Sequence, residues 1–472
     1  MLFNSYDYLL WFLPATLVGF FALGARPRLA QAWLTLASLV FYGWWDWRYL
    51  PLVLGSIGVN FAIALALQRR PSRPLLTAGI ALNLGLLGVF KYADFFLANA
   101  ARLSGGAPQM LHIVLPLGIS FFTFTQIAYL VDVHRRRAQE PVFGNYALFV
   151  TFFPHLLAGP ILHHSEMMPQ FAERSNKRPQ AANLASGLFL LAIGLVKKVL
   201  IADTFAPIAD AGFGAAGTLS APAAWIAVLA YTMQIYFDFS GYTDMALGAA
   251  RMFNIRMPLN FDSPYRSIDI REFWHRWHIT LSRFLREYLY IPLGGNRRGE
   301  ARTATNLLAT FVLGGLWHGA AWSFVVWGAL HGVALVVCRL WARRGVPLPR
   351  PVAWAVTFLF VSIAWTFFRA ASLDDAIAML RAMAGLNGVA ATATGSWLGG
   401  IATSLASSET FPRALALAPA VAGLLVVFLR ANSNAMVARF RPTLANGVLV
   451  VLALPVCVLQ LARVTPFLYF NF

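Results

Sequence analysis

Long apolar stretches separated by short polar segments dominate the chain. A helix that crosses a hydrocarbon core of roughly 30 Å needs about 20 such residues. Twelve stretches are predicted as spans: 8–23, 29–45, 50–67, 75–90, 112–131, 184–201, 222–239, 304–316, 320–338, 352–368, 415–429 and 447–461. The break between Leu316 and Ala320 is nominal, so the depth of His318 depends on where the chain turns.

Composition agrees with this pattern. Of 472 residues, 59% are hydrophobic and 12% are charged, and the mean hydropathy is +0.63, whereas soluble chains are about 25% charged. We therefore expect an all-α, polytopic membrane protein with about 11–13 transmembrane or re-entrant helices. Residues 1–472 are expected to form a single membrane-embedded domain.

The net charge of +18 could indicate nucleic acid, but Lys and Arg stand in short clusters between apolar runs. Membrane orientation explains such clusters more simply, so no nucleic-acid partner is expected. Cys338 and Cys457 lie in apolar runs without metal-ligand spacing, which argues against a disulfide or a zinc site. No basic residue precedes the first apolar run, so that run is predicted to be a permanent span and not a cleaved signal.

The basic clusters predict the orientation of the chain. They follow the first, third and fifth spans, and Lys and Arg gather on the cytoplasmic side, so the N-terminus is expected to face outward. Residues 145–162 are apolar but interrupted by Pro154, Gly159 and Pro160, and are predicted to be re-entrant or interfacial. The arginine-rich region 251–302 and the cluster at 339–344 then become cytoplasmic. Residues 370–412 become an external loop with an amphipathic helix.

The most charged part of the chain lies between Phe273 and Asn296. The overlapping region 269–290 is predicted to be one amphipathic interfacial helix, with apolar residues at spacings of three and four. A positive-inside surface helix is the simpler interpretation. The alternative is a phosphate-binding surface, because guanidinium groups bind phosphates bidentately and glycines let backbone amides approach. The candidate binding residues are Arg271, Arg276, Arg283, Arg286 and Asn296, the last preceded by Gly294 and Gly295.

Histidines in and after this region could carry chemistry. Glu272, His275 and His278 have the spacing of metal ligands, but no second such helix occurs, and no metal site is expected. His318 and His331 would lie on nearly opposite faces of a continuous helix, roughly 20 Å apart, too far to share a metal.

A buried imidazole at His318 is expected to stay neutral and to act as a general base on a hydroxyl, although a structural histidine is the alternative. Asp238, at the end of a span, could orient a histidine or cap the next helix.

With these residues in view, the sequence closely resembles the membrane-bound O-acyltransferase (MBOAT) family, in its bacterial branch typified by alginate O-acetylation. The resemblance rests on motifs that cover most of the chain in family order, with the strongest region at 231–332: LPLGISFFTFTQIAYLVDVHR from Leu115, FFPHLLAGPI from Phe152, YFDFSGYTDMALGAARMFNIRMPLNFDSPYRS from Tyr236, FWHRWHITLSRFLREYLYIPLGGNR from Phe273, GGLWHGAAWSFVVWGALHG from Gly314, and the closing PFLYFNF.

The resemblance implies helices around a central funnel, with His318 as the catalytic histidine and His278 as the second catalytic position. It implies no bound cofactor, acetyl-CoA as the acyl donor, and O-acetylation of an exopolysaccharide such as alginate or cellulose. It also implies the bacterial inner membrane and its lipids as the setting. The implied partners are a periplasmic SGNH-type (AlgX- or AlgJ-like) acetyltransferase and a polysaccharide synthase complex.

Two residues depart from the family pattern: His275 stands where arginine is expected, and His155 where glutamine is expected. These departures bear on subfamily and substrate. Two readings remain beside the acyltransferase: a polysaccharide or lipid exporter without covalent chemistry, and a redox protein that binds haem or iron.

Overall fold

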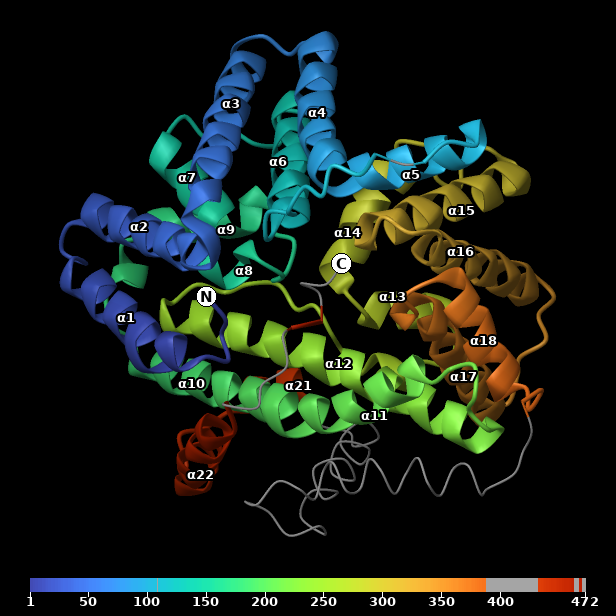
Figure 1. The fold of residues 1–472 in the computed structure, drawn as a ribbon. Helices are drawn as coiled ribbons and strands as arrows, with labels where there is room; N and C mark the ends of the chain where they lie inside the picture. The colour runs from blue at the N-terminus through green and yellow to red at the C-terminus, as the bar shows by residue number, and fades with distance from the viewer. Residues whose placement is uncertain (108, 388–431, 462–466, 469–472) are drawn as a thin grey trace. The chain divides into compact units, whose positions relative to one another are not determined.

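The computed structural model describes residues 1–107, 109–387, 432–461 and 467–468. Helices alone form the regular structure of these residues (Figure 1), which confirms the all-α, polytopic prediction. Among the described residues, five helical segments are long and apolar enough to cross a membrane: Pro27–Arg69, Arg73–Ser104, Ala181–Gly214, Trp322–Arg343 and Arg350–Arg369. The span predicted at 415–429 lies outside the described residues.

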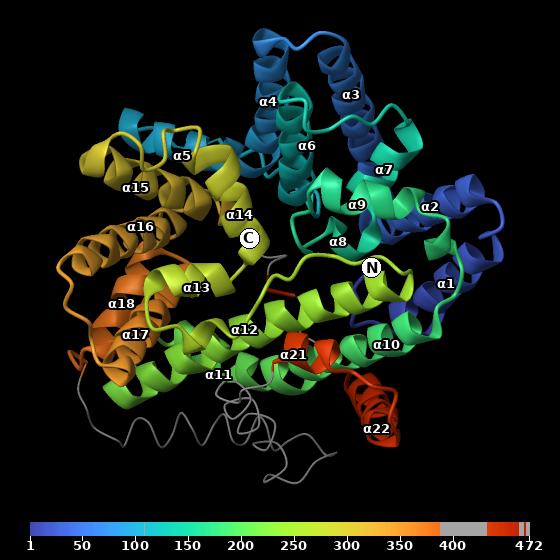
Figure 2. The same cartoon turned by 180° about the vertical axis from the view of Figure 1, so that it is seen from behind.

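The described chain divides into two compact units. The first comprises Met1–Ala192, Tyr242–Leu259 and Arg439–Leu461. Its helices are η1 (Asp7–Phe12), α1 (Leu13–Ala22), α2 (Pro27–Asp46), η2 (Trp47–Tyr49), α3 (Leu50–Arg69), α4 (Arg73–Leu87), η3 (Gly88–Tyr92), α5 (Ala93–Ser104), α6 (Ile119–His134), α7 (Phe143–Thr151), α8 (Phe153–Leu156), α9 (His164–Ala172), η4 (Ser175–Lys177), most of α10 (Ala181–Leu195) and α22 (Leu444–Gln460). In this unit α3, α4 and α6 pack together, as both ribbon views show (Figures 1 and 2).

The predicted interruption at 145–162 is confirmed. Helix α7 ends at Thr151 because Phe152 leaves the helical conformation, and the short α8 follows. Side chains from Tyr146 to Leu162 are buried, and Ser38 Oγ accepts a hydrogen bond of 3.1 Å from the Phe153 backbone N–H. Protein groups therefore satisfy this irregular backbone, as a membrane interior requires.

The second unit comprises the described residues within Ile193–Gly241, Asn260–Ala438 and Ala462–Phe472. It contains η5 (Val196–Ala202), α11 (Asp203–Gly214), most of α12 (Ala221–Met252), η6 (Pro264–Arg266), α13 (Ile270–Arg276), α14 (Ile279–Leu285), η7 (Arg286–Tyr290), α15 (Gly299–His318), α16 (Trp322–Arg343), α17 (Arg350–Arg369), α18 (Leu373–Met383) and α21 (Ser433–Ala438). Every residue of the candidate site below belongs to this unit.

Three predicted boundaries are wrong. Helix α6 begins at Ile119 and not at His112, because Gly118 adopts a left-handed conformation (φ +74) before it. Helix α12 continues to Met252, beyond the apolar run that ends at Phe239, since the polar residues that follow are buried within the protein. Region 269–290 is divided between α13, α14 and η7, so the single amphipathic helix does not exist.

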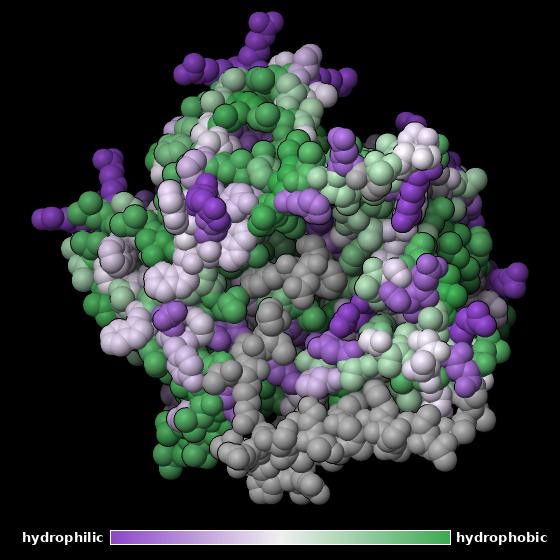
Figure 3. Space-filling model, viewed as in Figure 1, coloured by the Kyte–Doolittle hydropathy of each residue, from purple (hydrophilic) through white to green (hydrophobic). Residues whose placement is uncertain are grey.

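Hydrophobic side chains cover much of the outer surface of the described helices (Figure 3). Trp11 is 75% exposed, Val18 70% and Val356 57%. Apolar surface of this extent is stable only where lipid or other protein covers it. The surface therefore agrees with a multi-pass membrane protein.

Candidate active site

A tight helical hairpin positions His318. Helix α15 ends at His318, residues 319–321 turn in an extended conformation, and α16 returns alongside it, as both ribbon views show. A Cβ atom at Gly315 would collide with the Phe324 carbonyl oxygen, and one at Gly328 with the carbonyl oxygen of Phe311. The two backbones thus approach as closely as glycine allows, and this fixes the turn that follows His318.

Aromatic rings surround His318, which is 4% exposed. Ring centroids lie 4.9 Å away for Trp317, 5.2 Å for Trp327 and 5.1 Å for Phe368. The imidazole therefore sits in an apolar, water-poor environment, which disfavours its charged form. This is the environment expected of a neutral base.

The hairpin also changes the relation between His318 and His331. On one continuous helix they would lie on nearly opposite faces, but the turn brings both against one indole. Trp327 lies 5.2 Å from His318 and 4.8 Å from His331 between ring centroids. The estimate of 20 Å therefore does not apply, because the chain reverses between them.

His278 is fully buried at the break between α13 and α14 and has a left-handed backbone (φ +43). Its Nδ1 lies 3.1 Å from Asn260 Oδ1, which also accepts the Thr280 backbone N–H at 3.2 Å. A backbone N–H can only donate, so the shared Asn260 atom is the oxygen and His278 Nδ1 must be the protonated nitrogen. The Nε2 atom then carries the lone pair of a base, and burial lowers the pKa of His278 to about 3.

The break at His278 also separates the proposed metal-ligand positions. His275 is exposed and His278 is buried, so they no longer share a helix face. Glu272 pairs with Arg276, with 2.8 Å between Oε1 and Nη2. Within the described residues no group of three metal-ligating side chains gathers.

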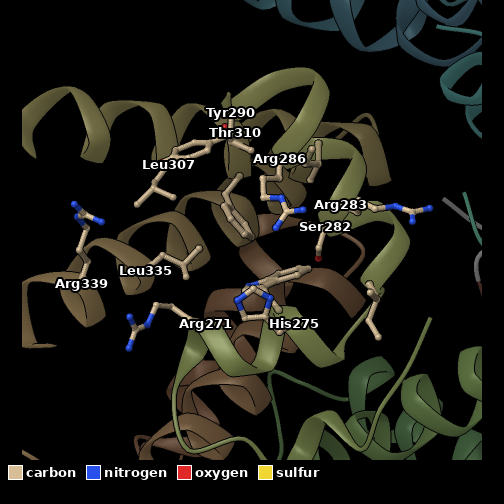
Figure 4. Close-up of a pocket in the computed structure, with 14 residues that line it drawn as sticks. Arg271, His275, Ser282, Arg283, Arg286, Tyr290, Leu307, Thr310, Leu335 and Arg339 are labelled. Carbon is tan, nitrogen blue, oxygen red and sulfur yellow. The ribbon is translucent and has the colours of Figure 1, made fainter. Parts of the chain in front are cut away.

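A pocket of about 390 Å³ opens beside these elements (Figure 4). Three of the predicted binding residues line it: Arg271, Arg283 and Arg286. Arg339, which the sequence did not single out, is a fourth. In Figure 4, Arg271 and Arg339 lie on one side and Arg283 and Arg286 on the other. Four guanidinium groups around one pocket favour a ligand with several negative charges.

Two predicted binding residues do not line the pocket. Arg276 pairs with Glu272 and donates to the Asp262 carbonyl oxygen at 3.1 Å. Asn296 is exposed on the loop after η7. In that loop Gly294 (φ +112) and Gly295 (φ +55) adopt left-handed conformations.

Comparison with known proteins decides the family. The sequence profile of the membrane-bound O-acyltransferase family, MBOAT, matches residues 133–373. The chain is 48% identical over 425 residues to the peptidoglycan O-acetyltransferase of Helicobacter pylori, covering 82% of this chain and 81% of that protein. It is 42% identical over 396 residues to the probable alginate O-acetylase AlgI of Azotobacter vinelandii, covering 81% and 78%. The chain belongs to the MBOAT family.

A more distant relative extends the range of transferred groups. The teichoic acid D-alanyltransferase of Bacillus subtilis is 27% identical over 271 residues, covering 53% of this chain and 68% of that protein. These comparisons confirm that the protein is an O-acyltransferase and remove the exporter from consideration.

The two departures from the family pattern have different surroundings in this O-acyltransferase. His275 lines the arginine pocket. His155 is buried in the first unit, and its Nε2 lies 2.8 Å from the Phe149 carbonyl oxygen. Only His275 is therefore placed to influence a ligand in the pocket.

The pocket and His318 are built on the same hairpin of the MBOAT fold. Leu307, Thr310 and Phe311 of α15 line the pocket. His318 lies seven positions after Phe311, which corresponds to roughly 10 Å along a helix. The nearest pocket-lining residue of α15 therefore lies about two helical turns before His318.

Proposed function

We propose that this O-acyltransferase moves acetyl groups from cytoplasmic acetyl-CoA through the bacterial inner membrane to an extracytoplasmic polysaccharide. His318 is the catalytic base in this proposal, and His278 is the second catalytic residue. The observation that carries it is the arginine pocket roughly two to three helical turns along α15 from a buried imidazole. The pocket would hold the donor, and His318 would act on the acceptor.

The charge of the pocket suits coenzyme A. Coenzyme A carries several negatively charged phosphates. The pocket offers four planar guanidinium donors to bind them, from Arg271, Arg283, Arg286 and Arg339. The apolar part of the lining, which includes Ile279, Leu285 and Leu335, suits the uncharged arm of the donor. Glu300 binds Arg339 and Arg343 at the rim and holds the Arg339 guanidinium in place, with 2.8 Å between Nη2 and Oε1.

The proposed chemistry uses His318 as a neutral imidazole. The imidazole accepts the proton of a hydroxyl as the hydroxyl oxygen attacks the thioester carbonyl carbon. A C–O bond forms, the C–S bond breaks, and the proton passes to the departing thiolate of CoA. General base catalysis of this kind contributes about 10²–10⁴-fold in rate.

His278 supports the same centre. Its ring lies 6.4 Å from that of Trp317, which in turn contacts His318 at 4.9 Å. With Nδ1 donating to Asn260, Nε2 is the ring atom that can take up a proton, and burial makes it a weak base. In our proposal this nitrogen accepts or passes a proton beside the acyl-transfer site.

The orientation proposed from the basic clusters agrees with the pocket. Arg339 at the end of α16 lines one space with Arg271, Arg283 and Arg286. The sequence predicted that region 251–302 and the cluster at 339–344 both lie on the cytoplasmic side. A cytoplasmic donor requires its binding pocket on that side. The N-terminus is then periplasmic.

The final acceptor is proposed to be a glycan hydroxyl. The relatives are named for peptidoglycan and alginate, and cellulose is a third candidate. The acetyl group would reach the polymer through a periplasmic SGNH-type acetyltransferase that works with a polysaccharide synthase complex.

Labelled acetyl-CoA tests the proposal. Inner-membrane vesicles with the full-length protein and its periplasmic partner are supplied with acetyl-CoA labelled in the acetyl group, and the label in purified polymer is counted. We expect His318→Ala to reduce labelling by at least about 100-fold. His112→Asn serves as a control, because His112 is exposed and its left-handed backbone (φ +49) accepts asparagine.

Each outcome decides a part of the proposal. A folded His318→Ala protein that labels polymer like the wild type would overturn the role of His318. Labelling that occurs in cells but not from acetyl-CoA in vesicles would overturn the donor. Labelling without the partner would overturn the relay and leave direct transfer.

A further inference from the structure

Two indole rings connect the arginine pocket with His318. Trp274 lines the pocket and is 7% exposed. Its ring centroid lies 5.8 Å from that of Trp327, and Trp327 lies 5.2 Å from His318. Between the pocket and the catalytic imidazole the space is thus filled by aromatic side chains.

One face of α16 carries side chains along the same route from the pocket to His318. On α16, Leu335 lines the pocket, His331 stands one turn earlier and Trp327 one turn before that. Residues four apart share a helix face. The row therefore leads from the pocket to the ring that contacts His318.

The side chains along this row carry three N–H donors, on Trp274, His331 and Trp327, and one acceptor, His331 Nδ1. Trp274 Nε1–H donates to His331 Nδ1 at 3.3 Å. An indole nitrogen can only donate, so His331 Nδ1 is the acceptor and its ring proton is on Nε2. His331 thus presents a second N–H beyond Trp274.

Two of these N–H groups have no acceptor. His331 Nε2 and Trp327 Nε1 are buried and make no hydrogen bond to any residue that the structure describes. A buried donor without a partner costs free energy. An arrangement in which a carbonyl oxygen reaches these groups would be more stable.

We propose that Trp274 selects the acyl group that passes from the pocket to His318, and that Trp327 and His331 donate hydrogen bonds to the carbonyl oxygens of the passing arm. This inference rests on the proposed function, because it assumes an acyl thioester donor in the pocket. The pantetheine arm carries amide carbonyls and the thioester carbonyl, which supply the acceptors. A two-carbon acyl group demands the least displacement of the rings, so acetyl is favoured over longer chains.

Acyl-chain selectivity is the test. The purified full-length wild type, Trp274→Phe, Trp274→Leu and Trp274→Ala are assayed with acetyl-, propionyl- and butyryl-CoA, and kcat/KM is measured for each. We expect the ratio of butyryl to acetyl kcat/KM to rise with each loss of side-chain volume, by at least about tenfold in Trp274→Ala. Trp341→Phe is the matched control, because Trp341 is 40% exposed on the same α16 and bonds to the Val346 carbonyl oxygen, away from the pocket.

A second variant isolates the hydrogen bonds. Trp327→Phe keeps an aromatic ring and removes the N–H, so we expect kcat/KM to fall about tenfold for all three donors while their ratio stays constant. Equal kcat/KM in Trp327→Phe and wild type would overturn the donor role of that N–H. In that case the N–H groups would instead point at the faces of aromatic rings, such as the ring of Phe360, whose centroid lies 5.3 Å from that of His331.

The possible outcomes distinguish a failure of the selectivity role from a failure of the proposed acyltransferase function. If the wild type transfers acetyl and the Trp274 variants that fold keep its chain-length ratio, the selectivity role is overturned and the acyltransferase proposal stands. Should the wild type use none of the three donors, the acyl-CoA assignment fails and this inference fails with it. Thermal unfolding of each variant identifies those that fold, and the graded series leaves at least the conservative Trp274→Phe to compare.

Discussion

The ammonium nitrogen of Lys198 lies 2.6 Å from Asp238 Oδ1 and 2.7 Å from Asp203 Oδ1. Lys198 and Asp238 are almost completely buried, with side chains 2% and 1% exposed. The second oxygen of Asp238 accepts the Leu468 backbone N–H at 3.0 Å. The sequence left open whether Asp238 orients a histidine or caps a helix, and the structure shows instead an ion pair that also holds residue 468.

Replacing Lys198 by methionine is expected to destabilise the protein strongly. The change leaves two carboxylates in an apolar environment without their cation, and breaking a buried pair in this way costs about 3–5 kcal/mol. Thermal unfolding in detergent measures the loss. Lys197→Met is the comparison, since Lys197 is the neighbouring buried lysine and bonds to the Ser433 hydroxyl at 3.0 Å. Equal melting temperatures for both variants would contradict the assigned role of the ion pair.

Replacing Gly328 by alanine is expected to disrupt the α15–α16 hairpin. The new methyl group would meet the Phe311 carbonyl oxygen, which is backbone and cannot move aside, and overpacking of this kind costs about 1–3 kcal/mol. Activity is expected to fall with stability, because the turn carrying His318 shifts. For comparison, Gly55→Ala in α3 adds a methyl group where nothing lies within 4 Å, and it is expected to stabilise by roughly 0.5–1 kcal/mol. A stable, fully active Gly328→Ala protein would refute the close approach.

His278 is expected to make the protein less stable in acid. Burial lowers its pKa from 6.5 to about 3, so between these values the unfolded chain binds a proton that the folded protein does not. Stability is therefore complete above pH 6.5 and declines as the pH falls toward 3, by roughly 2 kcal/mol at pH 5. His278→Asn is expected to flatten this decline. Asparagine tolerates the left-handed backbone and can still donate to Asn260, but it does not titrate. Melting temperatures from pH 4 to pH 8 provide the measurement, and parallel curves would show that His278 contributes nothing.

Arg286 is expected to contribute to donor binding. Arg286→Gln removes one guanidinium from the pocket, and the KM for acetyl-CoA should rise on the order of tenfold with a smaller change in kcat. The remaining affinity should also depend less steeply on salt. Arg297→Gln controls for net charge, because Arg297 is exposed and does not line the pocket. A similar rise in KM for both variants would indicate a general surface effect.

Patterns along the chain predicted the parts of the fold that depend on local hydrophobicity. The apolar runs at 29–45, 50–67 and 352–368 correspond to α2, α3 and α17 within a few residues. Such helices are defined by their own apolar length, because lipid accepts any sufficiently hydrophobic surface. A single histidine in an otherwise apolar run likewise marked His318 as unusual.

Tertiary contacts determined what the patterns missed. The helix predicted over 269–290 breaks because Asn260, which lies before α13, bonds to both His278 and Thr280. Arg339 joins the pocket from another helix, and no spacing connects it with Arg271. The sequence also placed Arg276 and Asn296 with the other binding residues by proximity alone. Proximity along the chain does not determine which side chains converge on one cavity.

The close glycine contacts of α15 and α16 bear on how the protein is made. These helices are consecutive and pair through residues near in sequence, so their hairpin can form early in synthesis, before more distant contacts. Phe368, which covers one side of His318, belongs to α17 and emerges from the ribosome later. The imidazole thus remains uncovered on a nascent chain, and the water-poor environment on which its chemistry depends is completed only when α17 has inserted.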